Sequence, residues 1–161
     1  MQERLQSLTK PKPEHLRGEV SPNFSLREIE VLQLIATGAR HADIAKYLGI
    51  TLKTIQAHQF HIHQRLIARD EPYPNTRRAV ILGVLEGLIE HIESAPQGVL
   101  SKRETEIIGM AIEGMPNAAI AHDLFISTKT VETHLQHAKE AFGAKSNIHA
   151  IAMVAMFLKE G

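Results

Sequence analysis

The sequence contains no cysteine and no tryptophan, carries no net charge, and has no hydrophobic run long enough to span a bilayer. The absence of cysteine excludes disulfide frameworks, thiolate nucleophiles and zinc–thiolate sites. The first ten residues hold no apolar signal segment, so we expect a cytoplasmic protein with no membrane partner. The balance of 18 basic and 18 acidic residues argues against a purely electrostatic coat on nucleic acid, although a local basic face remains compatible with it.

The composition is otherwise that of a folded protein. The chain has 161 residues, of which 43% are hydrophobic and 22% charged. These values lie near the norm for soluble globular proteins and far from the charge imbalance of disordered chains. The length predicts one ordinary domain or two small ones.

The chain contains an internal repeat. A shift of 76 positions aligns residues 25–68 with residues 101–144 without a gap, and 15 of the 44 aligned pairs are identical. The match then resumes at a shift of 71, with Ala79 against Ala150, because the first copy carries five extra residues around positions 71–75. The repeat predicts four segments, namely an N-terminal extension (1–23), a first domain (24–90), a linker (91–98) and a second domain (99–161).

Each copy has the pattern of four helices, so the predicted fold class is all-α. The first helix of each copy starts with a capping box, in which a serine and the glutamate three residues later satisfy each other's backbone N–H groups. Such a cap contributes about 1 kcal/mol. Glycines at 38 and 114 end these helices. Short second helices are predicted over 41–48 and 117–124.

The third and fourth helices are placed by their caps and apolar stripes. Thr51 and Ser127 are the predicted caps of the third helices, and Thr76 and Asn147 those of the fourth. The fourth-helix stripes run over 79–88 and 150–158, and each is either ordinary core or a dimer face. The third-helix stripes predicted to face inward are Ile55, Ile62 and Leu66 in the first copy and Val131, Leu135, Ala138 and Phe142 in the second.

A short helix, a tight turn and a longer helix with a polar outer face form a helix-turn-helix. The second helix of that motif lies in the major groove, where base edges present a readable pattern of donors and acceptors. Glutamine can pair with adenine, glutamate can accept from cytosine, and Ala, Thr or Phe can contact a thymine methyl. The outward positions are Lys53, Thr54, Gln56, Ala57, Phe60 and Gln64 in the first copy and Lys129, Thr130, Glu132, Thr133, Gln136 and Lys139 in the second.

These residues carry a resemblance to a known family. Leu26-Arg27-Glu28-x-Glu30-Val31-Leu32, Ile44-Ala45-x-x-Leu48-x-Ile50 and Lys53-Thr54-Ile55-x-x-His58 resemble the LuxR-type (GerE-type) helix-turn-helix DNA-binding domain. The second copy resembles it more closely, through Ile120-Ala121-x-x-Leu124-Phe125-Ile126-Ser127-x-Lys129-Thr130-Val131-Glu132-Thr133-His134 and Phe142-Gly143-Ala144-Lys145-Ser146. The chain therefore resembles two tandem copies of that domain.

The resemblance implies a four-helix domain that reads promoter DNA with its third helix and dimerises through its fourth. Base contacts are then expected from Gln56, Ala57 and Phe60 and from Glu132, Thr133 and Gln136. Phosphate contacts are expected from Lys53, Thr54, Lys129 and Thr130, and we add Arg65 and Lys139 to the predicted DNA-binding set.

Charge separates the two copies. Residues 24–90 hold eight bases and seven acids, whereas residues 91–161 hold six bases and eight acids. Residues 51–69, which include the third helix of the first copy, contain three basic residues and no acidic one, and two more basic residues follow at 77 and 78. These five are Lys53, Arg65, Arg69, Arg77 and Arg78. Because neutralisation of phosphates supplies most sequence-independent affinity, the first copy is expected to bind DNA more firmly.

The sequence supports a catalytic or metal-binding function less well than DNA binding. Helical spacing points His61 and His63 in nearly opposite directions, and His58 with His61 makes half a site at most. His58 and His134 are better explained as structural or phosphate-facing residues. The serines and threonines that resemble nucleophiles are explained as helix caps. We therefore expect no enzyme, no metal and no cofactor.

Two functions remain open. The first is a sequence-specific transcriptional regulator that binds double-stranded DNA in the bacterial cytoplasm and associates with the nucleoid when bound. Half-sites lie about 34 Å apart and the nine residues from 90 to 98 reach about 30 Å, so either one chain serves both half-sites or two chains form a homodimer. The alternative is a regulatory interaction protein, an anti-activator or co-regulator, that binds another transcription factor. Phe60 is either a thymine contact or a hydrophobic anchor for such a partner.

Overall fold

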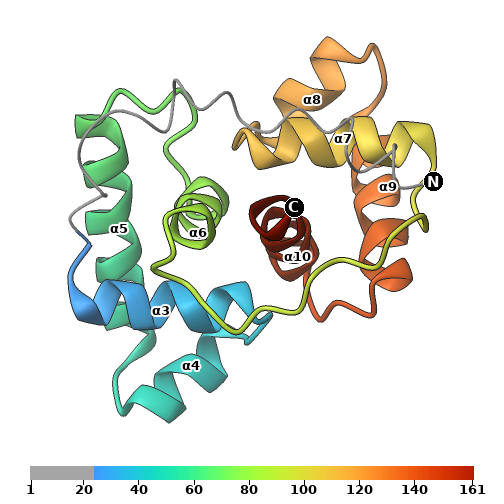
Figure 1. The fold of residues 1–161 in the computed structure, drawn as a ribbon. Helices are drawn as coiled ribbons and strands as arrows, with labels where there is room; N and C mark the ends of the chain where they lie inside the picture. The colour runs from blue at the N-terminus through green and yellow to red at the C-terminus, as the bar shows by residue number, and fades with distance from the viewer. Residues whose placement is uncertain (1–23) are drawn as a thin grey trace.

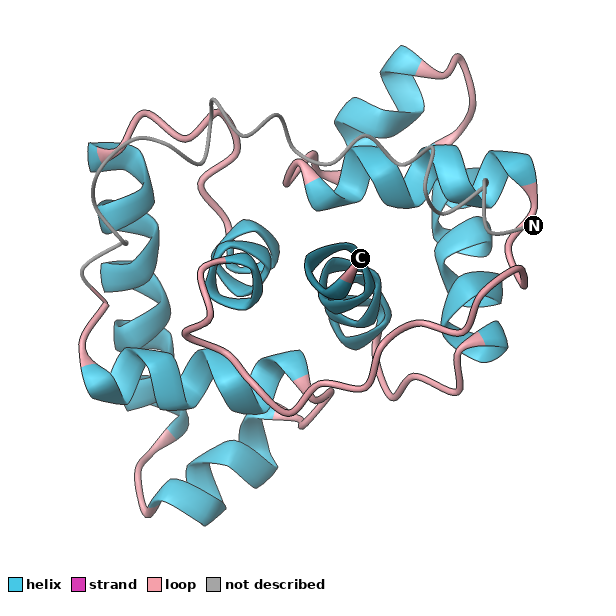
Figure 2. Cartoon of the chain, viewed as in Figure 1, coloured by secondary structure: helices cyan, strands magenta, loops and turns pink. Residues whose placement is uncertain are grey.

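The computed structural model describes residues 24–161, so the predicted extension over 1–23 lies outside the described residues. The described residues form helices and no strand, which confirms the predicted all-α class. Figure 1 and Figure 2 show the arrangement of these helices. Their bounds are α3 Leu26–Ala36, α4 His41–Leu48, α5 Leu52–Ala68, α6 Thr76–Leu85, α7 Lys102–Ile112, α8 Asn117–Asp123, α9 Thr128–Ala141 and α10 Asn147–Glu160.

The helix starts follow local sequence. At α3, Ser25 Oγ accepts from the Glu28 N–H at 3.2 Å, and the Glu28 carboxylate accepts from the Ser25 N–H at 2.9 Å. Ser101 and Glu104 form the same capping box at α7. Both predicted boxes are therefore confirmed.

The predicted caps of the fourth helices are wrong by one residue. Asn75 caps α6 in place of Thr76, because its side-chain oxygen accepts from the N–H of Arg78 at 2.9 Å. Ser146 caps α10 in place of Asn147 and accepts from the N–H of His149 at 3.0 Å. In both helices the residue that reaches the third N–H lies one position earlier than the sequence pattern suggested.

Helix α6 is also shorter than predicted. The apolar stripe suggested a helix through Leu88, but α6 ends at Leu85. Gly87 adopts a φ of +78°, and the Leu88 N–H donates to the Gly83 carbonyl at 2.8 Å, which closes the helix end. The predicted linker over 91–98 is thus the middle of a longer connection between α6 and α7, and it buries Ile92 and Ala95.

Helices α6 and α10 lie side by side at the centre of the molecule (Figure 1), where they pack against each other. Helices α3, α4 and α5 lie on one side of this pair, and α7, α8 and α9 lie on the other, related by an approximate two-fold rotation (Figure 1). The buried side chains of both halves join in one hydrophobic core. The division into domains over 24–90 and 99–161 stays a prediction.

The fourth helices bury each other within one chain. Val80 and Val84 of α6 and Ile151 and Val154 of α10 have no exposed surface. The predicted homodimer through the fourth helix requires this face to be open, and the other half of the same chain already covers it. Of the two roles predicted for these stripes, core and dimer face, the structure shows the first within one chain.

Two equivalent close contacts join the halves. The end of α3 meets the start of α10, where a Cβ placed on Gly38 would lie 2.6 Å from the Lys145 Cβ and 3.3 Å from the His149 Cβ. The end of α7 meets the start of α6, where a Cβ on Gly114 would lie 2.9 Å from the Arg78 Cβ. Arg78 and His149 are equivalent in the repeat, so the same backbone-to-side-chain contact forms on both sides of the two-fold axis.

The two sides differ in their chemistry. Burial lowers the pKa of His149, the nearby Lys145 charge lowers it further, and Glu93 opposes both. The N–H of Lys145 donates to His149 Nδ1 at 3.1 Å, which the neutral imidazole can accept. The α3–α10 contact therefore holds a neutral side chain where the α7–α6 contact holds the Arg78 cation.

The connection between the halves is attached to both of them. The Gln33 side chain of α3 donates to the Glu90 carbonyl at 2.6 Å and accepts from the Glu90 N–H at 2.9 Å. Further along, the Ala95 N–H donates to the carbonyl of Met153 in α10 at 3.0 Å. These bonds occupy backbone groups that a free linker would leave to water, so the connection is part of the folded body.

Candidate nucleic-acid interface

The turns before α5 and α9 have the same geometry. Gly49 adopts a φ of +65° and its repeat equivalent Phe125 a φ of +55°. The next residue then donates to a carbonyl five positions earlier, from Ile50 to Ala45 and from Ile126 to Ala121, each at 3.0 Å. This pattern ends one helix and starts the next within three or four residues, as a helix-turn-helix requires.

Helices α5 and α9, hereafter the reading helices, begin at confirmed caps. Thr51 Oγ1 accepts from the Thr54 N–H at 3.1 Å, and Ser127 Oγ accepts from the Thr130 N–H at 3.0 Å. The hydroxyls of Thr54 and Thr130, both predicted phosphate contacts, lie 3.0 and 2.8 Å from those cap hydroxyls. These two threonines are half-buried at the helix starts, so each hydroxyl already has a partner within its own turn.

Helix α5 separates buried and exposed faces as predicted. Ile55, Ile62 and Leu66 have no exposed surface. The four predicted contacts on the opposite face are exposed, and Phe60 retains 60% of its accessible surface. These contacts are Lys53, Gln56, Ala57 and Phe60.

Arg65 is engaged inside the first half. Its Nε lies 3.0 Å from a carboxylate oxygen of Glu28, which is 3% exposed, while the Arg65 side chain is 40% exposed. The pair ties the later turns of α5 to the first turn of α3. Arg65 therefore has a structural role in the first half.

In helix α9, more of the polar side chains pair with other groups of the same helix than in α5. Lys129 lies 3.7 Å from Glu132, and Gln136 donates to Glu140 at 2.6 Å. The Thr133 hydroxyl donates to the Lys129 carbonyl at 3.0 Å. Of the predicted contacts in this helix, Lys129, Glu132, Thr133 and Gln136 are exposed, whereas Thr130 and Lys139 are half-buried.

The duplicated helix-turn-helix agrees with a match to a protein-family model. The model for bacterial regulatory proteins of the luxR family matches residues 22–72 and 98–154, more than half of the chain. The chain belongs to the luxR family. The two matched segments contain both turns and both reading helices, and the predicted resemblance to the luxR family is confirmed.

Two curated relatives illustrate this membership. The transcriptional regulatory protein FixJ of Rhizobium meliloti (strain 1021) is 32% identical over 96 residues, which cover 52% of this chain and 46% of FixJ. The oxygen regulatory protein NreC of Staphylococcus aureus (strain MRSA252) is 47% identical over 53 residues, covering 33% of this chain and 24% of NreC. The chain thus spans less than half the length of these relatives. No solved structure gives a significant match.

The match places both helix-turn-helix segments in the luxR family of bacterial regulatory proteins. Within residues 24–161, no helix is long and apolar enough to cross a membrane.

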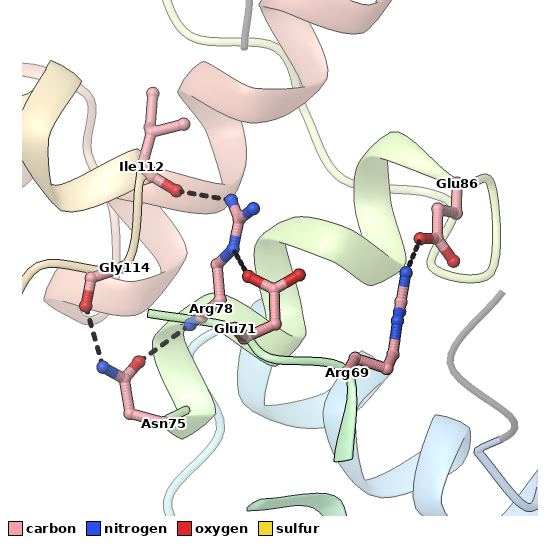
Figure 3. A network of polar contacts seen from close by, with 7 residues as sticks. All are labelled: Arg69, Glu71, Asn75, Arg78, Glu86, Ile112 and Gly114. Atoms are coloured by element: carbon pink, nitrogen blue, oxygen red, sulfur yellow. Dashed lines mark hydrogen bonds and ion pairs between the residues drawn. The ribbon is translucent and has the colours of Figure 1, made fainter. Parts of the chain in front are cut away.

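The structure removes most of the predicted basic cluster around α5 from the candidate interface. Arg77 donates to the Met115 carbonyl at 2.8 Å and to Asn117 Oδ1 at 3.1 Å, and burial lowers its pKa. Arg78 binds Glu71, and Arg69 lies 3.5 Å from Glu86 (Figure 3). With Arg65 on Glu28, four of the five basic residues have acidic or carbonyl partners inside the molecule. Their number in the sequence overstated the positive charge available to DNA.

The sequence pattern missed one set of polar residues. Glu104 in the first turn of α7 lies beside His134 and His137 of α9, with one donor atom from each residue within 4.8 Å of the others. The spacing of the two histidines placed them on one helix face, but the third residue comes from a different helix. Only the contact of α7 with α9 brings it there.

Proposed function

We propose that this luxR-family chain is a sequence-specific transcriptional regulator that acts on double-stranded DNA in the bacterial cytoplasm. The main observation in support is that both reading helices are exposed, and that each follows a short helix through an equivalent turn. In the proposed complex α5 and α9 enter the major groove. Lys53 and Lys129 meet phosphates, while Gln56, Ala57, Phe60, Glu132, Thr133 and Gln136 face base edges.

A single chain supplies both reading helices in this proposal. The approximate two-fold arrangement places α5 and α9 on opposite sides of the α6–α10 pair (Figure 1). Since α6 and α10 cover each other, the chain takes the place of a dimer built from two identical subunits. The half-sites it binds need not be identical, because the two reading faces carry different residues.

We expect the 161-residue chain to be monomeric in solution. Light scattering of the free protein should give a mass near 17.9 kDa, and the specific complex should contain one chain per duplex. The physical reason is that the apolar faces of α6 and α10 are already buried. A stable mass of twice this value would contradict the single-chain arrangement.

The first half is proposed to supply more of the affinity. In α5 the exposed Lys53 stands beside neutral side chains, whereas in α9 Lys129 lies 3.7 Å from Glu132, whose charge offsets it. The second half also has the more acidic composition. Neutralisation of phosphate should therefore be stronger at α5.

Mobility-shift titrations on a duplex selected from random sequence test this function. Gln56→Ala should weaken binding to the selected duplex by about 1 to 3 kcal/mol, because a bidentate base contact is lost. Binding to an unrelated duplex should stay unchanged. Lys53→Ala should weaken binding to both duplexes and reduce the salt slope by about 1.

Lys129→Ala is the matched control for Lys53→Ala, since the two lysines are equivalent in the repeat. Its effect should be smaller, because its charge is already offset by Glu132. If selection enriches no sequence, or if Gln56→Ala weakens both duplexes equally, the proposal of sequence-specific reading is overturned.

The second candidate is an interaction protein that binds another transcription factor through the same units. Exposed aromatic side chains favour it, since Tyr47 in α4 and Phe60 in α5 retain 79% and 60% of their surface. In that case Phe60→Ala should abolish regulation in cells, whereas Gln56→Ala and Lys53→Ala should leave it intact.

A further inference from the structure

Three potential ligands converge at the contact of α7 with α9. His134 and His137 lie one helical turn apart, so they share a face of α9, and the first turn of α7 brings Glu104 against that face. His137 Nδ1 lies 3.5 Å from Glu104 Oε1. One donor atom from each of the three residues lies within 4.8 Å of the other two.

Glu104 is fixed in place before any ligand binds. Its Oε2 accepts from the Ser101 N–H at 2.8 Å as part of the capping box, which leaves Oε1 directed toward His137. The Glu104 side chain is 14% exposed, whereas the His137 side chain is 56% exposed and free to change rotamer. One side of the cluster is therefore rigid and the other adjustable.

His134 contributes a buried nitrogen with no hydrogen-bond partner among residues 24–161, namely Nδ1. A buried polar atom without a partner is costly, so the ring of His134 is not committed to a protein hydrogen bond through this nitrogen.

The first half shows why the site belongs to the second half alone. The residues equivalent to Glu104, His134 and His137 are Glu28, His58 and His61. There the carboxylate is taken by Arg65, with Nε at 3.0 Å from one oxygen and a terminal nitrogen at 3.5 Å from the other. The residue equivalent to Arg65 is Ala141, so no guanidinium competes for Glu104 from that position.

We propose that Glu104, His134 and His137 bind one divalent transition-metal ion of the Zn²⁺ class. Two imidazoles and one carboxylate are a donor set suited to Zn²⁺ or Co²⁺ and poorly suited to Mg²⁺, which prefers oxygen. Metal–ligand bonds of about 2.0 to 2.2 Å place neighbouring donors roughly 3.3 Å apart. The His137–Glu104 pair is already at 3.5 Å, and no pair in the cluster has to approach by more than about 1.5 Å. Side-chain rotation, for which the exposed His137 has the most room, would supply the remaining movement, and water would complete the coordination.

The bound ion would join the start of α7 to the middle of α9. This link would stabilise the second half and hold its reading helix against the body of the chain. The site does not depend on DNA binding, so it can be tested separately from the proposed function.

The experiment uses the untagged 161-residue chain at pH 7.5. Calorimetric titration with Zn²⁺ should show one ion per chain at this site, and Co²⁺ should give a visible absorption spectrum typical of mixed nitrogen and oxygen ligands. Zn²⁺ should raise the Tm, whereas Mg²⁺ should not. No binding, or an equal Tm rise with Mg²⁺, would overturn the proposal.

Two variants identify the ligands. His137→Ala removes an exposed side chain, and Glu104→Gln keeps a residue compatible with the capping box while removing the anionic ligand. Each should weaken Zn²⁺ binding by about tenfold or more while the Tm without metal stays close to that of the parent. His61→Ala, the equivalent position in the first half, is the control and should bind as the parent does. If His137→Ala or Glu104→Gln retains parental affinity, or His61→Ala loses it, the proposed ligand set is wrong.

Discussion

Replacing Arg78 with alanine is expected to lower the free energy of unfolding by about 3 to 5 kcal/mol, because it leaves buried partners without their cation. Arg78 Nε lies 2.9 Å from the Glu71 carboxylate, and both side chains are almost fully buried. Its guanidinium also donates to the Ile112 carbonyl at 3.3 Å, across the contact between the halves (Figure 3). Without Arg78, the buried Glu71 carboxylate would lose its ion-pair partner and the Ile112 carbonyl would lose a hydrogen-bond donor.

Urea unfolding followed by circular dichroism measures this effect. Arg27→Ala is the matched control, since Arg27 pairs with Glu30 at 2.8 Å but both side chains are about half exposed. Exposed pairs contribute about 0 to 1 kcal/mol, so this control should change little. Equal and small losses in the two variants would show that Arg78 is not a buried partner.

Gly38→Ala is expected to destabilise the chain by about 2 to 5 kcal/mol, through backbone strain and a steric clash between the halves. Gly38 has a φ of +83°, which is unfavourable for alanine. The added Cβ would also lie 2.6 Å from the Lys145 Cβ, so α3 and the start of α10 would have to separate. That separation would reach the α6–α10 core, because α10 packs against both helices.

The Gly49→Ala variant measures the cost of backbone strain without a steric clash. Gly49 has a φ of +65°, but an added Cβ meets no other atom within 4 Å. Its cost should be about 1 to 2 kcal/mol, the strain alone. The difference between the two variants, measured by the same urea unfolding, reports the contact between the halves. If both variants lose the same stability, that contact does not restrict Gly38.

Much of the fold could be predicted because its causes are local. A capping box spans four residues, and Ser25 with Glu28 forms the predicted bonds. The buried stripe of α5 follows from the helical period, and Ile55, Ile62 and Leu66 are fully buried. Errors of one residue at the fourth-helix caps arose because neighbouring polar residues, such as Asn75 and Thr76, are both acceptable caps.

The candidate interface could be predicted less completely. The exposure of Lys53, Gln56 and Phe60 follows from periodicity. The pairing of Arg65 with Glu28, 37 residues away in the chain, does not. Charge counted along the sequence cannot distinguish a cation directed at solvent from one that holds two helices together.

The helices, their duplication and the luxR-type motif could be predicted from the amino-acid sequence, since each depends on residues within a few turns of one another or on a direct comparison of the two copies. Three further features were visible only in the folded chain: α6 and α10 cover each other, Arg78 lies in the contact between the halves, and Glu104 meets His134 and His137. These outcomes depend on which helix faces meet across the core. Contacts of this kind are set by how the helices of the whole chain pack, and the sequence pattern of a single segment does not predict them.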